Sequence, residues 1–253
     1  MIPPLIHSPT FLLAAVTATI LLGLGKGGFA GVGAIATPLV ALVTGPVQAA
    51  AIILPILLAQ DAVGVWAFRR VWHSGILALM IPAAALGVFL AWFFAAHLPE
   101  SAMELLLGLI SVVFAARSLW IQRNGAVPAP RDPPRWLGGL MGVASGVTSQ
   151  IAHAGQPPFQ IYVLPQRLPR DSLLGTTAIF FATVNWIKVP AYIALGQFTR
   201  PQLLTSAALL PLAIASTLAG VWLARRIDAD RFYTVIYIMM AVVGVRLVFE
   251  GLA

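Results

Sequence analysis

The chain alternates between long apolar segments and short polar breaks. A helix that spans a bilayer needs about 20 apolar residues. The segments that begin at 47, 74, 101, 171, 202 and 231 reach that length, so the pattern predicts an all-α polytopic membrane protein. The apolar stretches are 10–24, 29–43, 47–68, 74–95, 101–121, 136–147, 157–165, 171–195, 202–224 and 231–250.

Four of these segments form two pairs whose members look too short to cross a membrane one by one. GLGKGG joins 10–24 to 29–43, and HAGQPP joins 136–147 to 157–165. We interpret each pair as a helical hairpin, either re-entrant or tilted and fully crossing. Both readings leave the sidedness of the following segments unchanged.

A linker divides the chain into two related halves. Residues 122–134 (QRNGAVPAPRDPP) contain four prolines and several charges, which suit an extended, solvated connection. We therefore expect a first transmembrane repeat at 1–121 and a second at 135–253. The matched pairs are Arg117 with Arg246 and Pro82 with Pro211, 129 positions apart, and Gly28 with Gly155 and Pro38 with Pro165, 127 positions apart.

The basic residues of the loops predict how the two halves are oriented. If the loop with Arg69 and Arg70 is cytoplasmic, ten basic loop residues lie on that side and one, Arg200, on the other, as the positive-inside rule requires. The linker is then cytoplasmic and 96–100 is periplasmic. Each half contains an odd number of crossings. The prediction is two inverted-topology repeats, each a re-entrant or tilted helical hairpin followed by three transmembrane helices. Many secondary transporters have this architecture and bind substrate near mid-membrane.

Composition narrows the classes of protein. Hydrophobic residues make up 60% of the 253 residues and charged residues 9%, against about 25% charged residues in a soluble domain. Because most of the net charge of +7 comes from short loops, no nucleic-acid partner is expected. The sequence has no cysteine and no His-x-x-x-His pair, so we expect no metal and no cofactor. It shows no nucleophile–base set, which argues against an enzyme. The N-terminus lacks the basic start of a signal peptide and is expected to remain attached.

The first corner suggests an anion site. Lys26 is flanked by glycines, and an unpaired charge at membrane depth costs at least about 2.5–3.5 kcal/mol. Glycines let the backbone approach a ligand, and a helix that starts near residue 28 would offer free N–H groups. Lys26, Gly27 and Gly28 are therefore candidate substrate ligands. The glycines also belong to a stripe of small residues every fourth position, which favours close helix packing. Both roles are compatible.

The second corner repeats this design with other side chains. Gln150, His153 and Gln156 precede Pro157 and Pro158, and proline is favoured at the start of a helix. His153 aligns with Lys26 at the 127-residue separation, which places a potential cation in each half. The alternative is a neutral, hydrogen-bonded histidine.

Further polar residues lie within long apolar segments. Asn185 and Lys188 are one turn apart in 171–195 and are candidate ligands. Asp61 is the acidic residue well inside a segment; we expect it to neutralise Lys26 or Lys188, or to carry a proton. An inert ion pair is the alternative. Two lysines against one aspartate leave the interior positive by one, or by two with His153 protonated, which favours anions over cations.

The stretch GLGKGGFAGVGAIATPL, which is followed after a central hydrophilic loop by a second unit of the same kind, resembles the sulfite exporter family of the TauE/SafE type. The resemblance covers nearly the whole chain, although HAGQPP replaces the clustered glycines in the second unit. It implies a multi-pass protein of the bacterial inner membrane that moves sulfite, organosulfonates or related small anions. The resemblance alone favours export over import.

Together these observations predict a secondary transporter for a small sulfur-containing anion. Its partners would be that anion and the lipid bilayer, and a homodimer is compatible with the sequence. The two rivals are an anion channel with a continuous pore and a non-transporting membrane scaffold or assembly subunit with fully paired interior charges. The specific anion, the direction and the coupling ion are left open.

Overall fold

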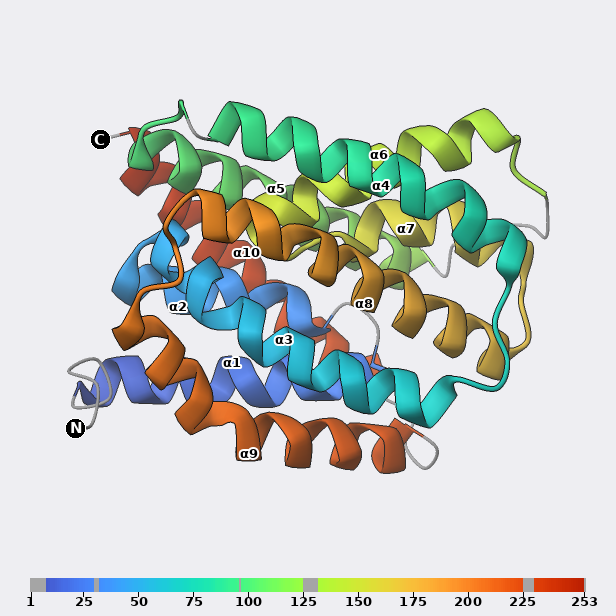
Figure 1. The fold of residues 1–253 in the computed structure, drawn as a ribbon, viewed down its shortest axis with the longest axis horizontal. Helices are drawn as coiled ribbons and strands as arrows, with labels where there is room; N and C mark the ends of the chain where they lie inside the picture. Colours follow the sequence, from blue (N-terminus) through green and yellow to red (C-terminus); the bar gives the residue numbers. More distant parts are fainter. Residues whose placement is uncertain (1–7, 30–31, 96, 125–131, 225–229, 253) are drawn as a thin grey trace.

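The structure is a computed structural model that describes residues 8–29, 32–95, 97–124, 132–224 and 230–252. Long helices run side by side along the molecule (Figure 1). The α-helices are α1 (Pro9–Gly27), α2 (Ala36–Thr44), α3 (Pro46–Phe68), α4 (Ser74–Ala95), α5 (Glu100–Asn124), α6 (Arg135–Ala152), α7 (Gln156–Val163), α8 (Arg170–Ala194), α9 (Arg200–Ala224) and α10 (Asp230–Leu252).

The predicted all-helical membrane fold is confirmed. Among the described residues, six helices are long and apolar enough to cross a bilayer, and they are α1, α3, α4, α5, α8 and α9. The sixth expected long segment, 231–250, is α10. One correction concerns α1, which we expected to be too short. Its 19 residues extend about 28 Å at the helical rise of 1.5 Å per residue.

The first corner differs from the prediction. Lys26 lies in the last turn of α1, and Gly28 ends the helix with φ 135°. The N–H of Gly28 donates to the Gly25 carbonyl, and the N–H of Phe29 donates to the Leu24 carbonyl. A positive φ favours glycine, which explains the stop. The following helix begins at Ala36, after a 3₁₀ turn at Val32–Ile35. The expected helix N-terminus near residue 28 is therefore wrong, whereas the one near residue 157 is correct because α7 begins at Gln156.

The linker begins later in the chain than predicted. Residues 122–124 belong to α5, which continues to Asn124. Residues 125–131, the central part of the predicted 122–134 linker, lie outside the described residues. The helix that follows, α6, continues to Ala152 and is longer than the expected 136–147.

Each of the three largest helix–helix interfaces joins a helix of the first half of the chain to a helix of the second half. The largest helix–helix interfaces are α1 with α9, α4 with α6 and α5 with α10. If α1 to α5 correspond in order to α6 to α10, the first two interfaces are equivalents of each other and the third is its own equivalent. Figure 1 shows corresponding helices running in opposite directions, for example α3 and α8. A superposition of the halves as inverted repeats remains a prediction.

Glycines allow the backbones of neighbouring helices to come into contact at these interfaces. A Cβ at Gly27 would lie 2.4 Å from the backbone of Gly220, and one at Gly146 would lie 2.1 Å from the Ala84 carbonyl oxygen. Backbone contact of this kind is typical of small-residue packing in membranes. The packing role predicted for the small-residue stripe is therefore present in α1 against α9, and glycine packs α6 against α4 in the same way.

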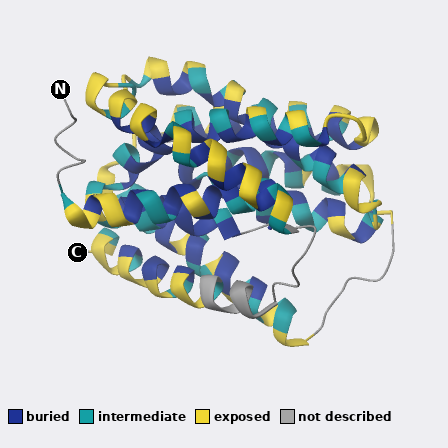
Figure 2. Ribbon diagram, turned by 90° about the horizontal axis from the view of Figure 1, so that it is seen from below, coloured by how far each residue is buried: buried dark blue, intermediate teal, exposed yellow. Residues whose placement is uncertain are grey.

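Burial follows the membrane pattern. Buried residues gather between the helices while exposed ones line the outer faces (Figure 2). Large apolar side chains are among the most exposed, such as Leu13 at 71%, Trp136 at 69% and Phe249 at 69%. Extended apolar surface of this kind suits contact with lipid. The fold is that of a multi-pass membrane protein.

Candidate functional site

The centre of the site is a carboxylate held by two helices from different halves. Lys26 of α1 forms an ion pair with Asp61 of α3 through Oδ1 of the carboxylate. Asn185 of α8 donates from Nδ2 to the other oxygen, Oδ2, at 2.6 Å. The Asp61 side chain is 1% exposed and that of Lys26 is 18% exposed. The structure therefore pairs Asp61 with Lys26, which was one of the two partners that the sequence left open.

The aromatic ring of Phe181 lies beside the Lys26 ammonium. The Lys26 ammonium lies 5.4 Å from the ring centroid of Phe181, close enough for a cation–π interaction. An ammonium has three N–H donors, and one is used by Asp61. The partial exposure of Lys26 leaves it able to offer donors to a ligand.

The second corner contains a histidine, His153, whose two ring nitrogens both have hydrogen-bond partners. His153 caps α6 in the left-handed conformation with φ 51°. Its Nε2 lies 3.0 Å from the Ala50 carbonyl oxygen, which only accepts, so Nε2 carries the hydrogen. Its Nδ1 lies 2.7 Å from Nζ of Lys188 and accepts from it. This is the hydrogen-bond pattern of a neutral imidazole, which agrees with the alternative that the sequence left open.

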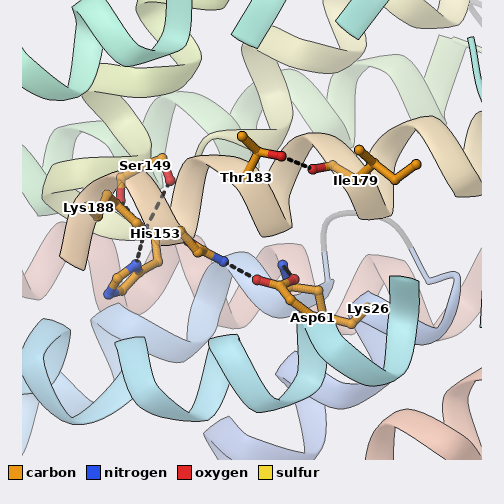
Figure 3. A network of polar contacts seen from close by, with 8 residues as sticks. Lys26, Asp61, Ser149, His153, Ile179, Thr183 and Lys188 are labelled. Carbon is orange, nitrogen blue, oxygen red and sulfur yellow. Dashed lines mark hydrogen bonds and ion pairs between the residues drawn. The ribbon is translucent and has the colours of Figure 1, made fainter. Parts of the chain in front are cut away.

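Lys188 lies behind the histidine. Its side chain is fully buried and donates to the carbonyl oxygen of Ser149 at 3.1 Å and to its hydroxyl at 3.2 Å (Figure 3). None of the contacts that the structure gives to this ammonium is a carboxylate. Lys188 thus orients His153 and the end of α6, and its hydrogen-bond partners are all neutral.

Both corners line one cavity of about 270 Å³. The first corner contributes Lys26 and Gly28, and the second contributes His153 and Gln156. Asp61 and Asn185 are also part of its polar wall. The rest of the wall is largely apolar, with Phe181 and several leucines. The structure therefore brings the two corners together at one cavity.

Three predicted ligands lie elsewhere. Gly27, Gln150 and Lys188 are not among the residues that line this cavity. Gly27 packs against α9. Lys188 contacts His153, which lines the cavity, but does not line the cavity itself. Gln150 borders a second, smaller cavity of about 20 Å³, and its buried Oε1 has no hydrogen-bond partner in the structure.

Arg170 is a cavity residue that the sequence pattern does not single out. It begins α8, is exposed, and lines the cavity, whereas the pattern of basic loops indicates only a role in orientation. With it, the charged residues of the cavity wall are two cations, Lys26 and Arg170, and one carboxylate, Asp61. The formal charge of the wall is +1, which favours an anion. Among the described residues, no group of three or more His, Cys, Asp or Glu could hold a metal ion.

Comparison with known proteins identifies the family. The chain matches the family described as Sulfite exporter TauE/SafE over residues 12–247. No curated protein and no solved structure matches it. The family match covers nearly the whole chain and both corners of the cavity. The chain is therefore a multi-pass membrane transporter that belongs to the sulfite exporter TauE/SafE family.

Proposed function

We propose that this protein is a secondary transporter that moves a small sulfur-containing anion, sulfite or an organosulfonate, out of the cell across the bacterial inner membrane. One observation carries the proposal: both corners line a single cavity whose charged side chains sum to +1. In this proposal Lys26, the backbone at Gly28, His153, Gln156 and Asn185 surround the anion. The export direction follows the family's description.

The ion pair supports a role for Asp61 in coupling. The anion must share Lys26 with the Asp61 carboxylate, and two negative groups beside one ammonium repel each other. Protonation of Asp61 would release Lys26 to the anion, while Asn185 would keep the carboxyl in place. Anion binding would then be linked to proton uptake, since linkage between two binding events is reciprocal.

A variant separates this coupling from simple charge balance. Asp61→Asn resembles the protonated carboxyl in shape and lacks the charge. We expect it to bind the anion at all pH values at which the protein is folded, with no proton uptake on binding. Calorimetry of sulfite binding in two buffers with different ionisation enthalpies measures the number of protons. Equal proton uptake by Asp61→Asn and the unchanged protein would exclude Asp61 as the coupling group.

Counterflow distinguishes a transporter from its rivals. Proteoliposomes loaded with unlabelled sulfite should take up external labelled sulfite faster than empty ones if the protein exchanges anions by alternating access. With the membrane potential held at zero, a channel with a continuous pore would show no such stimulation, and a scaffold would show no flux. Arg170→Gln at the cavity should weaken uptake. The matched control is Arg246→Gln, whose exposed side chain pairs with Glu250 on the outer face of α10.

A further inference from the structure

The second cavity lies at the opposite end of the same helices. It is lined by Pro46, Ala50, Gln150, Tyr192, Leu195 and Gln197. Three helices, α3, α6 and α8, contribute to both cavities. The larger cavity, here called the inner cavity, reaches the beginning of α8 at Arg170. The smaller one, the outer cavity, lies where α8 ends, at the other end of the molecule (Figure 1).

The register of α8 shows how close the two cavities come. Along this helix the inner cavity is lined from Arg170 to Asn185, and the outer cavity from Tyr192 onward. Asn185 and Tyr192 are seven positions apart, about 10 Å at the helical rise. Lys188 lies between them and is fully buried. About two turns of helix therefore divide one cavity from the other.

Residues that line the two cavities are in contact with each other or adjacent in the chain. Ser149 lines the inner cavity, while the next residue, Gln150, lines the outer one. The His153 ring belongs to the inner cavity and stacks on the Tyr192 ring of the outer cavity, with centroids 6.2 Å apart and planes 27° apart. The Tyr192 hydroxyl donates to the Gln150 carbonyl oxygen at 3.2 Å.

A proline stands beside these residues in each of the two central helices. Pro190 of α8 lies between Lys188 and Tyr192, and Pro55 of α3 lies between Ala50 and Asp61. Proline has no N–H to donate to the carbonyl four residues earlier, so it weakens the helix at that point. The outer ends of α3 and α8 can therefore bend without unfolding the inner halves.

We propose that His153, Lys188 and Tyr192 form the outer gate of the transport path, closed in this structure, and that the outer cavity is the outer end of that path. The proposal rests on the proposed function, because a gate matters only if an anion passes. The outer cavity of about 20 Å³ has room for about one water molecule. It must therefore widen, by movement of the outer ends of α3 and α8, before it takes an anion.

Cysteine accessibility tests the gate without any substrate, because the chain has no cysteine of its own. Thr177 lines the inner cavity. In right-side-out membrane vesicles, a membrane-impermeant methanethiosulfonate should leave Thr177→Cys unmodified from outside. In the double variant with Tyr192→Ala it should modify Thr177→Cys, because removal of the ring joins the cavities. Tyr192→Phe keeps the ring stack and should stay closed.

The matched control is Phe180→Ala, which removes a fully buried ring of α8 that stacks on Phe159 and does not line either cavity. It should leave Thr177→Cys protected. Modification in this control would show general loosening and would overturn the proposal. So would protection of Thr177→Cys in the Tyr192→Ala variant, or modification of Thr177→Cys in the chain that keeps Tyr192.

A second measurement keeps the proposal testable if Tyr192→Ala does not fold. Gln197→Cys, at the outer cavity, should react from outside, and Thr177→Cys should react only in inside-out vesicles. Reaction of both from one side would place both cavities on that side and overturn the gate. These outcomes do not depend on sulfite, so a protein that fails to transport sulfite could still show the gate.

Discussion

At the scale of single residues, the site is organised around one buried carboxylate. Asp61 accepts from Lys26 and from Asn185, so two halves of the chain meet at its two oxygens. Breaking a buried ion pair by removing one partner costs about 3–5 kcal/mol, because the remaining charge stays buried. This ion pair therefore has a structural role, and a ligand role for Lys26 must be separated from it by experiment.

The first prediction separates the two roles of Lys26. Lys26→Met should lower the free energy of unfolding by about 3–5 kcal/mol, since it strands the Asp61 carboxylate. The double variant Lys26→Met with Asp61→Leu should recover most of that loss. If Lys26 is a ligand, the double variant should still bind sulfite about ten- to a hundredfold more weakly, because a charge-assisted hydrogen bond contributes about 1.5–3 kcal/mol.

Thermal unfolding in detergent and sulfite uptake into liposomes measure the two effects for both variants. Arg246→Met is the control, because an exposed ion pair contributes only about 0–1 kcal/mol. Full transport by the double variant would exclude Lys26 as a ligand.

The second prediction concerns Asn185. Asn185→Leu removes the donor to Oδ2 of Asp61 and a polar group of the cavity wall. We expect a loss of stability of about 1.5–3 kcal/mol, the contribution of a hydrogen bond to a charged group, together with weaker sulfite binding. Thr183→Val on the same helix is the control, because the hydrogen bond that the structure gives to the Thr183 hydroxyl is to the Ile179 carbonyl within α8 (Figure 3). Equal effects of the two substitutions on binding would remove Asn185 from the site.

At the scale of helices, the hydrophobic pattern was sufficient for most of the fold. It predicted the positions of the six segments that were expected to be long, because membrane helices are set by apolar length, but it ended α1 and α6 too early. It failed at residues 28–35, where glycine and small apolar residues read as the start of a helix. A positive φ at Gly28 and a 3₁₀ turn delay that start to Ala36. Hydropathy contains no information about such local backbone angles.

The contacts of the site were predictable only in part. The sequence singled out Lys26, Asp61, His153 and Asn185 because charged and polar groups at membrane depth are costly. Which of them meet depends on the rotation and depth of α1, α3 and α8, and close glycine contacts set these. The same packing turns Gly27 and Lys188 away from the cavity wall. Arg170 was missed because a basic residue at a helix end is also what orientation in the membrane requires.

The third prediction tests glycine packing at the scale of one helix interface. Gly27→Ala would place Cβ 2.4 Å from the Gly220 backbone, and rigid backbone cannot yield cheaply. Overpacking of this kind costs about 1–3 kcal/mol, so the midpoint of thermal unfolding should fall. Gly139→Ala is the matched control, because a Cβ there meets nothing within 4 Å. Equal midpoints for the two variants would contradict the close contact between α1 and α9.

At the scale of the whole molecule, the two ends differ in charge. The connection after α3 and the starts of α6 and α8 share one end, as Figure 1 shows, and carry Arg69, Arg70, Arg135 and Arg170. The connection between α4 and α5 lies at the other end and has no Lys or Arg among residues 97–99. The inner cavity reaches the basic end, so the positive-inside rule predicts that it opens to the cytoplasm.

The fourth prediction tests this orientation and, through it, the inverted arrangement of the halves. Leu98→Cys, Trp72→Cys and Ala129→Cys place single thiols between α4 and α5, between α3 and α4, and in the linker. Leu98 is 38% exposed and Trp72 is 47% exposed, so both positions are reachable. An impermeant maleimide added to intact cells should modify position 98 and spare positions 72 and 129, which should react only after the membrane is opened.

The reverse pattern would reverse the orientation and make the inner cavity periplasmic, with Tyr192 on the cytoplasmic side. Modification of positions 98 and 72 from the same side would contradict α4 as a crossing. Reaction of position 129 from the side opposite to position 72 would require an odd number of crossings after α3, and therefore an even number in the first half once α3 is counted. The two halves would then run parallel, and the inverted repeat would be excluded.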